Sequence, residues 1–190
     1  MTNNKSFLAA AICASLATST LAQEVLTGDK ASACGAILCL VGSTRPSECT
    51  PPLRRYFSIN ARYWVDTIAQ RGNFLNLCPT VSTDPKMQSL IPAIVNGAGR
   101  CDAQSLNQST VTNYSNDGNG NQHFYIPSTM PAYCVNYVQH AYADLKTSAP
   151  RYVGTESRNG YWVDPAQYAQ AVKDYAIHIA AQDAAAASTN

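Results

Sequence analysis

The sequence has 190 residues, of which 46% are hydrophobic and 13% are charged, with 13 Lys plus Arg against 12 Asp plus Glu. This composition is that of one modest globular domain rather than of a disordered chain. A formal net charge of +1 leaves no excess of cations to neutralise phosphates, so bulk nucleic-acid binding is excluded.

Residues 1–22 have the pattern of a cleavable signal peptide. Lys5 supplies the positive charge, residues 7–12 form an apolar run, and Thr20-Leu21-Ala22 provides small residues before a cleavage site. The apolar stretch is shorter than the roughly 20 residues that span a bilayer. We therefore expect cleavage after Ala22 and export. The mature chain, residues 23–190, should form a single helical domain that does not insert into a membrane.

Seven cysteines occur in the chain, and removal of the signal peptide takes Cys13 with it. An even number of cysteines in an exported chain indicates disulfides. No Cys-x-x-Cys pair occurs and the histidines are scattered, so we expect no metal site and no cofactor. The remaining cysteines are Cys34, Cys39, Cys49, Cys78, Cys101 and Cys134.

The cysteine-rich block 29–79 predicts helices. A short helix is expected over residues 33–41 and a longer one over about 60–77. Cys34 and Cys39 are five residues apart, about 140° around a helix, so they should have different partners. If the two helices form an antiparallel hairpin, the geometry favours the pairs Cys39–Cys49 and Cys34–Cys78.

One stripe of the longer helix is predicted to face a core. Trp64, Ile68 and Leu75 fall on that stripe, and Arg71 lies inside it. A buried arginine must be paired or satisfied by carbonyl groups, because an isolated charge in a core is costly. We therefore assign structural roles to Arg71, Trp64 and Phe74.

Residues 81–125 change in character and predict a long irregular loop. Prolines and glycines precede a run of Asn, Ser, Thr and Gly, and only residues 87–91 with their neighbours favour a helix. Residues 117–121 have acid and amide side chains at the spacing of the first ligands of a calcium loop. The glycine and the last acid of such a loop are missing, so a turn-rich surface loop is the better interpretation.

The last third, residues 126–187, predicts helices again. A helix that begins near Pro131 would bring Cys134 and Tyr142 to one buried face. Cys101, which anchors the middle loop, is then the remaining partner for Cys134.

Two short aromatic runs, residues 152–154 and 160–163, could pair as a β-hairpin, and Asp164 caps a final helix. The expected fold class is therefore mainly α. It is a small disulfide-stabilised helical domain with a long irregular middle loop and one candidate short β-hairpin.

Catalytic signatures are sparse in this sequence. The chain has no nucleophile elbow, no His-Glu-x-x-His, no phosphate-binding glycine loop and no unpaired mature cysteine. A pair of carboxylates for sugar hydrolysis would have to use Glu48 and Glu156, which lie in polar loops typical of solvated surface. We therefore expect no enzyme activity.

Arginines are concentrated between Arg45 and Arg71, where five of them accompany two acids. This block is either a partner surface or a solvated helix face, and the tyrosine-rich C-terminal part is either a binding face or core. The candidate residues of a partner surface are Arg54, Arg55, Arg62, Tyr161 and Trp162.

Residues 29–79 carry a specific pattern of four cysteines and two short motifs. The motifs are Tyr-Phe-Ser-Ile at residues 56–59 and Phe-Leu-x-x-Cys-Pro at residues 74–79, and the second contains the last of the four cysteines. This pattern resembles the TrbM/KikA family of conjugal transfer (mating-pair formation) proteins. The resemblance implies a plasmid-encoded protein in the periplasm of a Gram-negative bacterium, which supports a type IV secretion system and pilus assembly without catalytic residues. Its partners would be other components of that apparatus.

Two other functions stay open at this point. One is a periplasmic peptidoglycan hydrolase, and the other is a protein that binds a small ligand or calcium. A homodimer is consistent with the neutral charge and the aromatic C-terminal region, although nothing in the sequence requires one.

Overall fold

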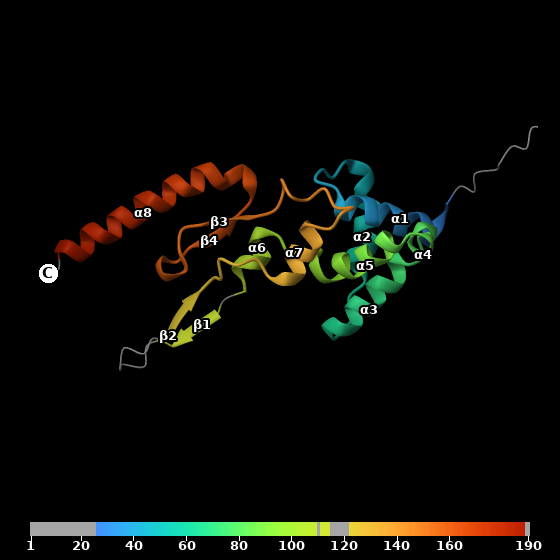
Figure 1. The fold of residues 1–190 in the computed structure, drawn as a ribbon, viewed down its shortest axis with the longest axis horizontal. Helices are drawn as coiled ribbons and strands as arrows, with labels where there is room; N and C mark the ends of the chain where they lie inside the picture. The colour runs from blue at the N-terminus through green and yellow to red at the C-terminus, as the bar shows by residue number, and fades with distance from the viewer. Residues whose placement is uncertain (1–25, 110, 115–121, 189–190) are drawn as a thin grey trace, which may run out of the picture.

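A computed structural model describes residues 26–109, 111–114 and 122–188 of the chain. The expected signal peptide over residues 1–22 and the calcium-like segment 117–121 therefore lie outside the described residues. Figure 1 shows an elongated molecule in which α1 to α5 gather at one end, and the β3–β4 hairpin with α8 lies at the other.

The described part of the chain is mainly helical, as the sequence predicts. Two antiparallel hairpins, β1 with β2 and β3 with β4, supply the strands. The helices are α1 (Gly28–Val41), α2 (Thr50–Ser58), α3 (Trp64–Leu75), α4 (Pro79–Thr83), α5 (Pro85–Gly97), α6 (Ala103–Asn107), α7 (Ala132–Val138) and α8 (Tyr168–Ser188). The strands are β1 (Val111–Tyr114), β2 (Gln122–Tyr125), β3 (Arg151–Val153) and β4 (Tyr161–Val163), and 3-10 turns occur at Ser47–Cys49, Glu156–Arg158 and Pro165–Gln167.

Three disulfides cross-link the helices. Cys39 is joined to Cys49 and Cys34 to Cys78, with Cα atoms 5.5 Å and 4.9 Å apart. The third bridge joins Cys101 to Cys134, also with Cα atoms 5.5 Å apart. The first two are the pairs that the antiparallel hairpin of helices predicts, and they connect α1 to the segments before α2 and after α3. The third is the pair that remains, as expected.

The helix expected over residues 60–77 forms but is shorter than predicted, because α3 begins at Trp64 and residues 59–63 separate it from α2. Ile59 adopts an extended conformation with ψ of 103°. Side chains of α3 satisfy the backbone of this break: Thr67 Oγ1 accepts from Ala61 N at 2.9 Å, and Arg71 Nε donates to Ile59 O at 3.1 Å. The break is therefore a specific feature that α3 itself stabilises.

The irregular loop expected over residues 81–125 is wrong for much of its length, because α5 and α6 lie within it. Asp84 caps α5 by accepting hydrogen bonds from Lys86 N at 2.8 Å and Met87 N at 3.4 Å. Pro92, which suggests a helix breaker, lies inside α5 on its exposed side.

The core lies among these helices, and α5 contributes more of it than the sequence indicates. Leu90, Ile91, Ile94 and Val95 form an apolar stripe of α5 that is at most 5% exposed. The stripe packs with buried residues of α1, α3 and α7. The segment therefore has the apolar surface that an irregular loop lacks.

At the C-terminal end, the hairpin of β3 and β4 forms as expected, with Tyr152 opposite Trp162. The helix expected from Pro131 is shorter than predicted, because α7 ends at Val138. Tyr142 is consequently 40% exposed rather than buried, and its hydroxyl donates to Asp84 Oδ2 at 2.7 Å. Only Ala171 of α8 is buried, so this helix packs little of its surface against the rest of the molecule.

The disulfide that joins α7 to the end of α5 should contribute strongly to stability. Replacing Cys101 and Cys134 together by serine is expected to lower the free energy of unfolding by about 2–5 kcal/mol, because the unfolded chain loses a cross-link. Urea denaturation measures this change. Peptide mapping without reductant should find the three bridges, and a free thiol or a different pairing in the oxidised protein would contradict the structure.

Gly97 allows the close contact of α5 with α7. A Cβ atom built on Gly97 would lie 2.5 Å from Tyr137 Cβ, whereas one on Gly72 of α3 meets nothing within 4 Å. Gly97→Ala should therefore destabilise the protein by about 1–3 kcal/mol through overpacking. Gly72→Ala is the matched control and should raise stability by up to about 1 kcal/mol through helix propensity. Equal melting temperatures for the two variants would contradict this packing.

Candidate functional site

The two acids that a sugar hydrolase would need do not have the properties of a proton donor. Glu156 accepts hydrogen bonds from Ser128 N at 2.6 Å and Ser128 Oγ at 2.8 Å. These bonds hold the pKa of the Glu156 carboxyl below its usual range, whereas a general acid needs a raised pKa. Glu48 lies exposed on the 3-10 turn before α2. The hydrolase hypothesis therefore gains no support from these residues.

A serine and a histidine that the sequence does not single out meet between α5 and the end of α7. Ser89 Oγ lies 3.0 Å from His140 Nε2. His140 Nδ1 accepts from Tyr142 N at 3.2 Å, so in the neutral ring the proton is on Nε2 and points at Ser89. Ser89 in turn donates to Lys86 O at 2.9 Å. His140 in this state cannot take a proton from Ser89, so the pair is not an activated nucleophile.

The arginines of the predicted partner surface have different environments. Arg55 is neutralised by Asp29, whose oxygens lie 3.2 Å from Nε and 3.1 Å from Nη2, and it covers the Phe74 ring at 5.0 Å. The Arg55 guanidinium lowers the pKa of Asp29 through this hydrogen-bonded pair. Arg54 and Arg62 are exposed, and Arg62 lies over the Tyr63 ring at 5.4 Å.

Trp162 is not part of an exposed surface, contrary to its place among the candidate partner residues. It is 6% exposed, and its indole Nε1 donates to Pro127 O at 2.9 Å. Its backbone N donates to Asn107 Oδ1 at 2.7 Å, which joins β4 to α6. Tyr161 is half-buried in a small cluster with Val153 of β3. In the described structure, both aromatic residues therefore contribute to packing.

Arg71 is 8% exposed and is held by a carbonyl group and aromatic rings. Its Cζ lies 4.9 Å from the ring centre of Tyr56, 5.3 Å from Phe57 and 5.7 Å from Trp64. Together with the hydrogen bond to Ile59 O, these ring faces offset the cost of burying the charge. Arg71 thus joins α2 to α3.

The core-facing position expected for Trp64 is wrong, because this side chain is 40% exposed. The break before α3 places Trp64 in the first turn of the helix, at the edge of the core. Phe74, near the other end of α3, is 5% exposed and packs in the core. Trp64 therefore presents part of its ring to solvent while it contacts Arg71.

Arg100 completes this group of side chains. Its Cζ lies 4.9 Å from the ring centre of Trp64 and 4.2 Å from that of Tyr133. Arg100 precedes Cys101 and Tyr133 precedes Cys134, so the disulfide between these cysteines brings the two side chains together. We call the following residues the Arg–aromatic cluster: Tyr56, Phe57, Trp64, Arg71, Arg100 and Tyr133.

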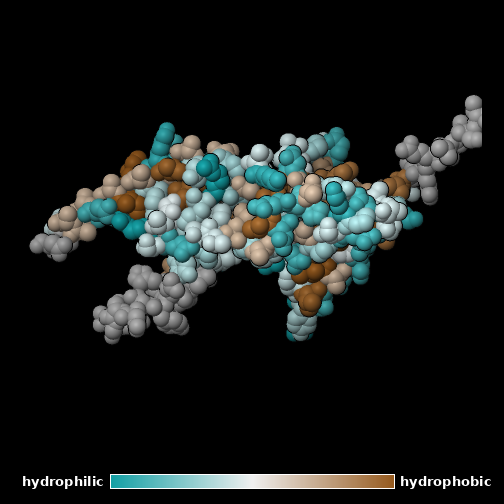
Figure 2. All heavy atoms as spheres, viewed as in Figure 1, coloured by the Kyte–Doolittle hydropathy of each residue, from teal (hydrophilic) through white to brown (hydrophobic). Residues whose placement is uncertain are grey.

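Arg100 is a functional candidate that the sequence analysis missed, whereas Tyr133 belongs to the tyrosine-rich part that it interprets as either a binding face or core. The signal that could find them is their position beside the two cysteines of one bridge. Apolar side chains extend the cluster along the start of α3, where Tyr63 is 59% exposed and Val65 is 70% exposed. Figure 2 shows hydrophobic residues at the surface of the lobe that contains α3. Exposed aromatic residues combined with arginine are typical of protein interfaces.

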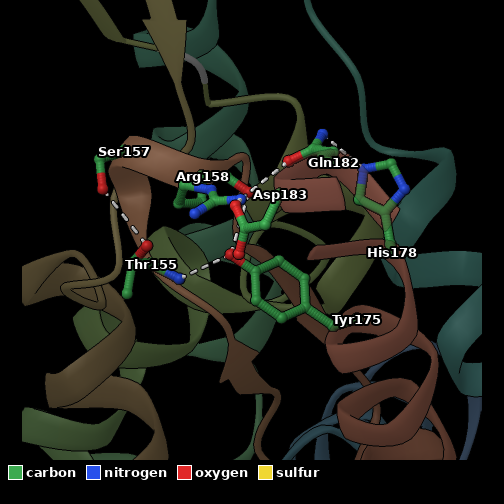
Figure 3. Close-up of polar contacts among 7 residues, drawn as sticks. All are labelled: Thr155, Ser157, Arg158, Tyr175, His178, Gln182 and Asp183. Atoms are coloured by element: carbon green, nitrogen blue, oxygen red, sulfur yellow. Dashed lines mark hydrogen bonds and ion pairs between the residues drawn. The ribbon is translucent and has the colours of Figure 1, made fainter. Parts of the chain in front are cut away.

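A second group of polar contacts attaches α8 to the turn between β3 and β4 (Figure 3). Tyr175 Oη donates to Arg158 O at 3.0 Å and accepts from Thr155 N at 3.3 Å. Arg158 Nη2 lies 2.6 Å from Asp183 Oδ1. These contacts join the helix to the turn, and Asp183 neutralises the charge of Arg158.

Among the described residues, no cluster of three or more His, Cys, Asp or Glu could hold a metal ion. No helix in that part of the chain is both long and apolar enough to cross a membrane. The partly exposed Trp64 ring and its contact with Arg100 make the Arg–aromatic cluster the candidate functional surface.

A family model described as TrbM matches residues 25–176. This range contains the three disulfides, the Arg–aromatic cluster and the start of α8. No curated protein and no solved structure matches the chain.

The Tyr56 hydroxyl is buried at 0% exposure and has no hydrogen-bond partner among the described residues. Burial raises the pKa of Tyr56 to about 12, and the positive charge of Arg71 opposes part of this shift. Tyr56→Phe should therefore not destabilise the protein at neutral pH, because it removes an unsatisfied group.

Above pH about 10 the unfolded state loses the tyrosine proton first, so the free energy of unfolding of the wild type falls towards pH 12. The Tyr56→Phe variant should show a shallower fall in urea denaturation between these pH values. Tyr63→Phe, at an exposed tyrosine, is the control and should follow the wild type. An equal alkaline loss of stability in all three proteins would contradict the burial of this hydroxyl.

Proposed function

Because the chain belongs to the TrbM family, a conjugal transfer protein family, we propose that it is a periplasmic accessory protein of plasmid conjugation. It supports the type IV secretion system and assembly of the conjugative pilus by binding another protein of that apparatus. The family match carries this proposal, and the partly exposed side chains of the Arg–aromatic cluster support a role in binding.

Two features support the periplasmic location. Three disulfides cross-link the described domain, and disulfides persist in oxidising compartments such as the periplasm. Residues 1–22 also have the charge and apolar pattern of a signal peptide. An exported and oxidised domain would reach the cell compartment through which the secretion apparatus passes.

Binding rather than catalysis agrees best with the side chains. Glu156 is held as a carboxylate, and Ser89 receives a hydrogen bond from His140 instead of losing its proton to it. In contrast, Trp64, Tyr133 and Arg100 are the residue types that contribute most energy at protein interfaces. Self-association into a homodimer remains part of the proposal, and light scattering of the purified protein measures it.

Deletion of the gene from the donor should lower both plasmid transfer and sensitivity to a pilus-dependent phage, and the wild-type gene should restore both. Deletion from the recipient should change neither, because the apparatus is assembled in the donor. Mating frequency and phage plating are the measurements. Normal transfer from a donor without the gene would refute the proposed function.

A further inference from the structure

A surface hollow of about 530 Å³ lies between α5 and α7. Tyr133 connects the hollow with Arg100, since its ring contacts Arg100 and also lines the hollow. Pro92 and Ala93 of α5 supply apolar lining, and Asn136 and Gln139 supply amide groups from the opposite side. We call the hollow together with Arg100 the α5–α7 groove.

Arg100 is half-buried and is held in a defined orientation. The rings of Trp64 and Tyr133 contact its guanidinium, and Nη1 donates to Asn96 O at 3.3 Å. Asn96 also lines the hollow, so this bond links Arg100 to a residue of the groove. A guanidinium contacted by aromatic rings keeps N–H groups at its edge for a carboxylate, which it can bind with two parallel hydrogen bonds.

The positive charge at this end of the groove has no counterion within the described part of the chain. The ion pairs there are Arg55 with Asp29 and Arg158 with Asp183, and neither involves the groove. Arg71 and Arg100 both lie over the ring of Trp64, so two cations share one aromatic side chain. A carboxylate from outside would reduce the repulsion between these cations.

The amide side chains in the hollow are also available. In the described structure, neither the Asn136 nor the Gln139 side chain takes part in a hydrogen bond, and both residues are exposed on or next to α7. Such amides can bind the backbone of a peptide, while Pro92 and Ala93 contact an apolar side chain. The groove thus offers an anion site, amide groups and apolar contact next to one another.

On the basis of the interaction function above, we propose that the α5–α7 groove binds an acidic segment of a partner protein. A carboxylate of that segment pairs with Arg100, and an apolar side chain nearby in the segment occupies the hollow.

A protein carboxylate fits this groove better than a nucleic acid does. Binding to a phosphate backbone needs several cations in a row, whereas the groove has the half-buried guanidinium of Arg100, and the other arginine over the Trp64 ring, Arg71, is buried. The formal net charge of the whole chain is only +1. Short-range pairing with one or two carboxylates therefore supplies the specificity.

The test uses a fluorescein-labelled peptide in which glutamates flank a central pair of leucines, with the full mature protein and fluorescence anisotropy as readout. A peptide with glutamine in place of glutamate and a single-stranded oligonucleotide are the comparison ligands. We expect the glutamate peptide to bind more tightly than either comparison ligand, with an affinity that falls as salt is added.

Arg100→Gln should weaken binding of the glutamate peptide by about tenfold or more, since it removes a charged hydrogen-bond donor. Asn136→Glu, at an exposed position of α7 away from the core, should weaken it through repulsion. Arg151→Gln is the matched control, because Arg151 also lies over a tyrosine ring, that of Tyr168, at 3.4 Å but far along the chain from the groove. Circular dichroism checks that each variant is folded.

Equal affinity for the glutamate and glutamine peptides, tighter binding of the oligonucleotide, or unchanged binding by both groove variants would overturn the proposal. Mating assays separate it from the proposed function. If the deletion abolishes transfer and Asn136→Glu fully restores it, the groove proposal fails alone. If the deletion leaves transfer unchanged, the proposed function fails, whether or not the glutamate peptide binds to the protein.

Discussion

The Cys101–Cys134 disulfide is the constraint on which the centre of this molecule depends. It joins the segment after α5 to α7, and Gly97 lets the two helices approach until the backbone of one touches the Tyr137 ring of the other. The same bridge sets Arg100 beside Tyr133. This disulfide therefore holds α5 and α7 together in the core, and it also brings the side chains of Arg100 and Tyr133 into contact.

The arginines of this protein show how a positive charge can be kept near a small core without a carboxylate. Arg71 is almost fully buried, yet its charge is met by one carbonyl oxygen and by three ring faces. Each ring contact contributes only about 0.5–2 kcal/mol, so several are needed to offset the loss of hydration. Because no acid neutralises Arg71 in the described structure, its charge adds to that of Arg100, which lies over the same Trp64 ring.

The sequence was sufficient to predict those features that depend on cysteine spacing or on a short local pattern of residues. The number and spacing of cysteines led to the three bridges, and the aromatic runs led to the β3–β4 hairpin. The prediction failed for α5, because Pro92 is usually read as a helix breaker and here lies on the solvent side of the helix. It failed for Trp64 because nothing in the sequence marks the break at Ile59, which depends on hydrogen bonds from Thr67 and Arg71. The contact of Arg100 with Tyr133 depends on tertiary structure alone.

The order of the cysteines along the chain has a consequence for how this protein matures. Along the chain, the bridge from Cys34 to Cys78 encloses the bridge from Cys39 to Cys49. Cys34 is therefore not joined to Cys39, the next cysteine after it in the sequence. If the chain is exported from its N-terminus, as proposed above, Cys34 and Cys39 enter the oxidising compartment together, well before Cys78 follows. Cys34 must then either wait as a thiol or exchange a first, incorrect partner for the correct one. The yield of native protein should consequently depend on a disulfide isomerase as well as on an oxidase.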